Sequence, residues 1–116
     1  MAKPPDPFHE FVAELFSGMG PVSIRRMFGG AGVYADGLMF ALLADEVIYL
    51  KTDESFRAEL EAEGSSPFMW TRPSDGKVFD MAYLSLPEAA LDEPDAAVDW
   101  GRRALAVARA AKAKKK

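Results

Sequence analysis

The dipeptide Asp36-Gly37 constrains the fold most, because it separates two apolar runs and tolerates the positive φ angles of a tight β-hairpin turn. Asp45-Glu46 is a weaker second turn of the same kind. Together they predict three antiparallel strands, at about 24–35, 38–44 and 47–51. Gly29-Gly30 interrupts the first strand, where residues without a Cβ suit a bulge or bend.

Helix signals lie on both sides of this segment. Asp6 is a suitable N-cap with Pro7 as the first helical residue, and the helical spacing of apolar residues continues to Met19. Asp53 is expected to cap a second helix at 54–63, and Pro94 to start a third. Two further strands are predicted at 68–72 and 78–86. Trp70 and Tyr83 fit strand packing and Trp100 fits the buried stripe of the last helix, so we expect all of them in the core.

These elements predict a two-layer α+β fold, with an antiparallel five-stranded sheet and helices in the order α-β-β-β-α-β-β-α. A chain of 116 residues fits one domain, which we place at 1–111, followed by a basic flexible tail at 112–116.

Composition excludes several classes of function. The chain has no cysteine and one histidine, His9, so we expect no disulfide, no metal site and no cofactor. His9 lies early in the first helix with no distinctive serine motif nearby, and we predict no catalytic residues. No segment approaches the roughly 20 apolar residues that span a bilayer, which predicts a cytoplasmic protein without membrane contact.

The charges are unevenly distributed. Residues 1–100 hold seven basic and all 18 acidic side chains, whereas 101–116 hold seven basic side chains. An acidic body repels phosphate backbones and a basic end attracts them, so composition alone does not choose between protein and nucleic-acid partners.

The predicted strands do not alternate between apolar and polar residues, so neither face of the sheet is polar. If the turns pair Ala35 with Leu38 and Ala44 with Val47, each face of the three central strands is apolar. One face then holds Tyr34, Met39, Ala41, Leu43, Ile48 and Leu50, and the other holds Val33, Leu38, Phe40, Leu42, Val47, Tyr49 and Lys51. Either the helices cover both faces, or they share one face and leave the side of Phe40 and Tyr49 as a dimer or partner interface. We favour the second arrangement.

Arg25-Arg26-Met27-Phe28-Gly29-Gly30-Ala31-Gly32, followed by the two hairpins, resembles the N-terminal domain of the TfoX/Sxy competence regulators. The resemblance covers about 8–100 and implies an antiparallel sheet with helices and a non-enzymatic role in transcription regulation. Full-length members of that family carry a C-terminal domain. The chain stops after one such domain, from which we expect a stand-alone adaptor.

The leading prediction is therefore a regulatory domain that contacts a protein partner or a second copy of itself. The residues expected at that contact are Arg25, Arg26, Phe28, Gly29, Gly30, Phe40, Tyr49 and Lys51. One alternative is nucleic-acid binding through Arg25, Arg26 and the basic end, which comprises Arg102, Arg103, Arg109, Lys112, Lys114, Lys115 and Lys116. Another is an anion or small ligand at the Gly29–Gly32 bend, where backbone N–H groups could face a phosphate.

Overall fold

The computed structural model describes residues 6–27 and 30–114. Its elements in chain order are α1 (Pro7–Leu15), the 3-10 turn η1 (Ser17–Met19), β1 (Ser23–Met27), β2 (Gly30–Ala35), β3 (Leu38–Ala44), β4 (Val47–Lys51), α2 (Glu54–Ala62), β5 (Pro67–Thr71), β6 (Val78–Ser85), the 3-10 turn η2 (Glu88–Asp92) and α3 (Pro94–Lys114). The predicted α+β class is confirmed. The last helix extends to Lys114, past residue 111, where we expected a flexible tail to begin.

Local signals in the sequence fix the helix starts. The Asp6 carboxylate accepts the backbone N–H of Phe8 at 2.9 Å, and the Asp53 carboxylate accepts that of Phe56 at 2.8 Å, as N-caps do. The first helix ends at Leu15, earlier than its apolar spacing predicts, and passes into η1. Among the described residues, no helix is both long and apolar enough to cross a bilayer.

The described residues form one antiparallel sheet of six strands, in the order β1-β2-β3-β4-β6-β5. The prediction of five strands was wrong because the segment at 24–35 is a hairpin rather than one bent strand. β1 and β2 are antiparallel, with Met27 paired to Gly30, so the chain reverses between them. Glycines between two apolar runs serve a turn as readily as a bulge, and the sequence pattern does not separate the two cases.

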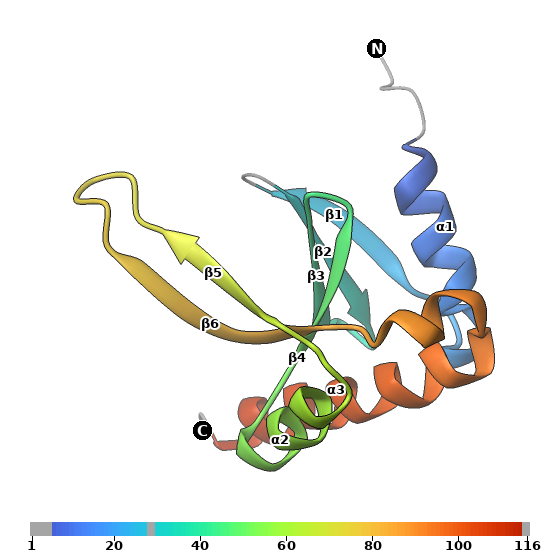
Figure 1. Ribbon diagram of the computed structural model, residues 1–116. Helices are drawn as coiled ribbons and strands as arrows, with labels where there is room; N and C mark the ends of the chain where they lie inside the picture. The colour runs from blue at the N-terminus through green and yellow to red at the C-terminus, as the bar shows by residue number, and fades with distance from the viewer. Residues whose placement is uncertain (1–5, 28–29, 115–116) are drawn as a thin grey trace.

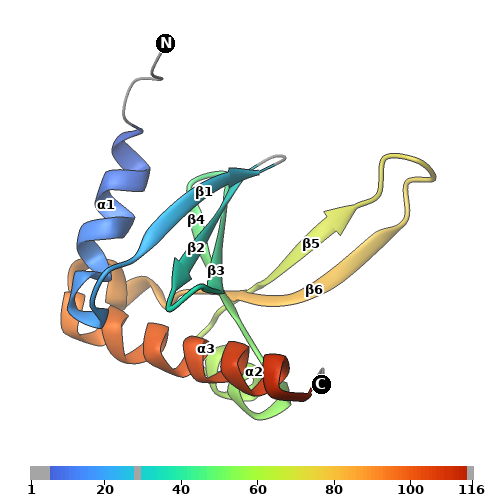
Figure 2. The same cartoon turned by 180° about the vertical axis from the view of Figure 1, so that it is seen from behind.

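The helices share one face of the sheet (Figures 1 and 2). α3 runs beneath β3 and β4. Ala97, Ala104 and Ala108 of α3 are buried, and their small side chains allow close approach to the strands. α2 adds Phe56 and Leu60 to the same core, with the Phe56 ring 6.0 Å from that of Trp100. This is the arrangement that we favoured from the sequence.

An irregularity in the β2–β3 pairing decides which side chains reach the core. Val33 pairs with Ala41 and Tyr34 with Met39, so Phe40 is an extra residue between the two pairs. Such a bulge reverses the alternation of the side chains beyond it. Phe40 therefore faces the helices, fully buried, with its ring edge-on to Phe16 at 5.4 Å. The prediction that Phe40 shares a surface with Tyr49 was wrong.

The hairpin of β5 and β6, residues 67–85, extends away from the rest of the sheet and is called the arm below (Figure 1). Its base is anchored by Thr52, whose backbone N–H and hydroxyl both donate to the Ala82 carbonyl, at 3.0 and 2.7 Å. Arg57 of α2 makes a two-pronged contact with the Asp80 carboxylate at 3.1 and 2.6 Å. These contacts set the arm's direction relative to the sheet.

Candidate interaction face

The face of the sheet opposite the helices, called the open face below, is hollowed into a groove of about 370 Å³. One wall comes from β1, β2 and β3, and the other from the arm. The groove is lined by Met27, Gly30, Met39, Leu42, Leu43, Ala44, Phe68, Trp70, Met81 and Tyr83. Because of the bulge at Phe40, Met39 is on this face instead of the core, together with Leu42.

Aromatic and methionine side chains of the groove are exposed although they are apolar. Trp70 is 40% and Met81 41% exposed, so the expectation that Trp70 lies in the core was wrong. Trp70 stacks on Phe79 at 6.2 Å, and Tyr49 packs on Phe68 at 5.2 Å. Exposed apolar side chains that lie together, as Trp70 and Met81 do along one groove, mark an interaction surface more often than scattered ones do.

Three cations lie over aromatic rings at the border of the open face and are called the rim below. Arg25 lies 5.1 Å from the Tyr34 ring centre, Lys51 5.3 Å from that of Tyr83, and Arg72 5.0 Å from that of Phe79. Each distance falls within the range of a cation–π contact. Burial raises the pKa of Tyr83, with neighbouring Tyr34 adding to the effect, so the Tyr83 hydroxyl is neutral at neutral pH.

The structure separates the two adjacent arginines, as strand geometry predicts. Arg25 lies over Tyr34 at the rim, whereas Arg26 lines a different hollow together with His9, Asp45 and Glu46. His9 Nε2 is 3.6 Å from Asp6 Oδ2. Of the residues expected at a partner contact, Arg25, Gly30, Tyr49 and Lys51 therefore gather at the open face, and Arg26 and Phe40 do not.

Phe28 and Gly29 lie outside the described residues, so the Gly29–Gly32 bend is assessed from its other members. A Cβ at Gly30 would overlap the Leu43 carbonyl oxygen, and one at Gly32 would lie 2.6 Å from Met39 Sδ. Both glycines therefore make room for neighbouring protein atoms. Close packing explains these positions without an anion.

The arginines of the basic end, which were expected to bind nucleic acid, contact other parts of the fold. Arg103 pairs with Glu59 and lies 4.7 Å from the Phe56 ring centre, Arg109 pairs with Asp36, and Arg102 donates to the Gly18 carbonyl at 3.0 Å. The Arg103 guanidinium lowers the pKa of Glu59. Lys112 and Lys114 lie in the last turn of α3, and Lys115 and Lys116 lie outside the described residues.

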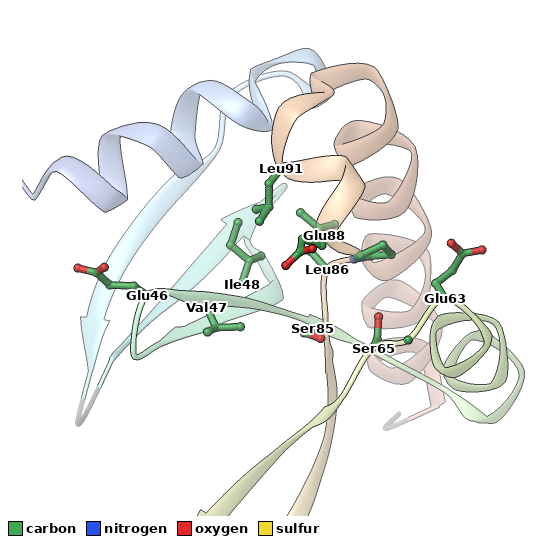
Figure 3. Close-up of a pocket in the computed structure, with 11 residues that line it drawn as sticks. Glu46, Val47, Ile48, Glu63, Ser65, Ser85, Leu86, Glu88 and Leu91 are labelled. Atoms are coloured by element: carbon green, nitrogen blue, oxygen red, sulfur yellow. The ribbon is translucent and has the colours of Figure 1, made fainter.

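A hollow of about 440 Å³ lies near η2 and the end of α2 (Figure 3). Glu46 and Glu63 stand at its two ends, with Glu88 near its middle. The Ser65 hydroxyl is buried and has no hydrogen-bond partner within the described part of the chain. The carboxylates do not converge, and residues 6–27 and 30–114 contain no group of three or more His, Cys, Asp or Glu side chains that could hold a metal.

The helix-backed sheet and its apolar groove define a small two-layer α+β domain. The chain belongs to the TfoX N-terminal domain family, whose model matches residues 14–108. That match covers most of the chain and confirms the resemblance seen in the sequence. No curated protein matches the chain significantly.

Sequence reasoning missed the arm's part of the groove. Phe68 and Trp70 alternate along β5, and Phe79 and Met81 alternate along β6, so each pair points to one side of its strand. That alternation is visible in the sequence. What the sequence does not show is that β6 pairs with β4, and that Phe68 lies against Tyr49 while Trp70 and Met81 line one groove with Leu42.

Proposed function

We propose that the chain is a regulatory domain that acts by binding a protein partner in the groove of its open face. The observation that carries this proposal is the position of the helices on one face, which leaves on the other an apolar groove that Trp70, 40% exposed, and Met81, 41% exposed, help to line. Burying such aromatic side chains in a partner interface contributes strongly to affinity. Membership of the TfoX N-terminal domain family supports a regulatory role, of which control of competence genes is the form that the family suggests.

Nucleic-acid binding through the basic end has less support, because Arg103 and Arg109 are already paired with Glu59 and Asp36. Anion binding at the Gly29–Gly32 bend has less support as well, because Gly30 and Gly32 are explained by their close neighbours. In the experiment below, capture that nuclease abolishes would favour nucleic-acid binding.

The test is affinity capture from an extract of the source cells, with and without nuclease, by the wild-type chain and two variants. Trp70→Ala/Met81→Ala removes two exposed groove side chains, and Phe11→Ala removes an equally exposed aromatic ring from α1, at 42%. We expect a nuclease-resistant protein that the groove variant loses and the Phe11 variant retains. Equal capture by all three chains, or capture abolished by nuclease, would contradict the proposal. Circular dichroism and thermal melting confirm that the variants are folded.

A further inference from the structure

The open face has a charge pattern of its own. Its rim carries Arg25, Lys51 and Arg72, while no carboxylate lines the groove between them among the described residues. Arg72 is paired with Asp75, but neither Arg25 nor Lys51 takes part in an ion pair within the described part of the chain. In a chain of net charge −4, this is an apolar surface with cations on its border, and the hollow that adjoins it at Met27 and Ala44 is lined by Asp45 and Glu46.

From this pattern we infer the chemistry of the occupant: an acidic, amphipathic protein segment. Its apolar side chains fill the groove, and its carboxylates meet Arg25 and Lys51 at the rim. The inference rests on the proposed function and adds the partner's charge to it. Complementary charge at the border of an apolar interface speeds encounter and excludes wrongly charged partners.

The methionines of the groove suit such an occupant. Met27, Met39 and Met81 all line it. Met39 and Met27 side chains also approach the space above Gly32, where a Cβ would lie 2.6 Å from Met39 Sδ and 3.0 Å from Met27 Cε. Because methionine is unbranched and flexible, a surface rich in it adapts to apolar side chains of different shape. The rim cations then supply the selectivity that the adaptable groove lacks.

A second copy of the chain fits the groove less well. In a twofold dimer the same surface is used on both subunits, so the basic rim of one copy would meet the basic rim of the other. Single-stranded nucleic acid also fits less well, although stacked aromatics beside cations are a feature of its binding sites. Residues 1–100 carry 18 acidic against seven basic side chains, and that charge repels a phosphate backbone, which is charged at every nucleotide, more strongly than a short segment with a few carboxylates.

The experiment selects peptides from a random library displayed on phage, with the full wild-type chain as the target. Enriched peptides are synthesised with a fluorescent label, and binding is followed by fluorescence anisotropy. We expect sequences that combine Asp or Glu with aromatic or aliphatic residues. Arg25→Glu/Lys51→Glu should weaken their binding by about tenfold or more, as expected when interfacial charges are reversed. The matched control Lys112→Glu/Lys114→Glu makes the same change in net charge at the end of α3 and should retain binding.

Other outcomes would overturn the inference. They are enrichment of basic or uncharged peptides, no enrichment at all, equal binding by Arg25→Glu/Lys51→Glu, or a labelled oligo-dT strand that binds more tightly than the peptides. The Trp70→Ala/Met81→Ala variant distinguishes failure of this inference from failure of the proposed function. If that variant loses the peptides while the rim variant keeps them, the groove is a binding site and the acidic partner is wrong. If neither variant loses them, both proposals fail.

Discussion

The two faces of the sheet are built from alternate residues of the same strands, yet one is sealed and the other is open. On the covered face, Val33, Phe40 and Leu50 are fully buried beneath α1, η1 and α3. On the open face, Met39, Leu42 and Tyr49 are half-buried, and the exposed aromatics of the arm lie beside them. Apolar character alone therefore does not mark a core; the placement of the helices decides which face becomes one.

The largest effect that tests this comparison is expected on the covered face. Phe40→Ala removes a ring packed on Phe16 and should lower the free energy of unfolding by about 3–5 kcal/mol. Trp70→Ala, on the open face, loses mainly its stacking on Phe79 and should cost no more than about 1.5 kcal/mol. Urea denaturation of both variants measures the difference. Similar costs would mean that the open face contributes to folding as the core does.

Substitutions at two glycines test whether side chains on the open face can move to accept an added Cβ where the backbone cannot. A Cβ at Gly30 would meet the Leu43 carbonyl oxygen, which is fixed in the sheet, so Gly30→Ala should cost about 1–3 kcal/mol as overpacking does. A Cβ at Gly32 would meet Met39 Sδ, which can move into the groove, so Gly32→Ala should cost less than about 1 kcal/mol. Chemical denaturation gives both values, and the reverse ranking would refute the flexibility assigned to Met39.

The smallest expected effect concerns the contact between Arg57 and the arm. The Arg57 guanidinium holds the pKa of Asp80 below its usual range, so the folded state keeps this carboxylate ionised to lower pH than the unfolded state does. The stabilisation is complete above the unfolded pKa of about 3.9 and is lost as the pH falls through the lower folded pKa. Asp80→Asn should reduce the drop in melting temperature between pH 6 and pH 3, measured by circular dichroism. An unchanged drop would show that the contact adds no stability.

Short-range signals in the sequence predicted much of the fold. The caps Asp6 and Asp53 were placed correctly, and so were the turns at Asp36-Gly37 and Asp45-Glu46, where all four residues have positive φ. These features depend on a few neighbouring residues, whose conformational preferences the sequence states directly.

The features that were not predicted depend on pairing between strands. Both neighbours of Phe40 are apolar, so no polar residue marks the shift in register, and the sequence pattern cannot reveal the bulge. The pairing of β4 with β6 spans α2 and β5, and no local motif specifies it. For the candidate site, Arg25, Tyr49 and Lys51 were proposed from the sequence and lie at the open face, whereas placing Trp70 and Met81 there required that long-range pairing to be known.

The attachment of the arm has a thermodynamic consequence. β6 joins the rest of the sheet at three paired positions, Tyr49 with Ser85, Leu50 with Leu84 and Lys51 with Tyr83, all near the arm's base. A molecule seated in the groove touches both β1–β3 and the arm residues Phe68, Trp70, Met81 and Tyr83, and so it connects two parts of the sheet that are otherwise joined through β4. Binding in the groove and local opening of the hairpin are then thermodynamically linked. A change that slows amide hydrogen exchange in β5 by stabilising the closed hairpin must raise the affinity for the bound molecule by the same factor.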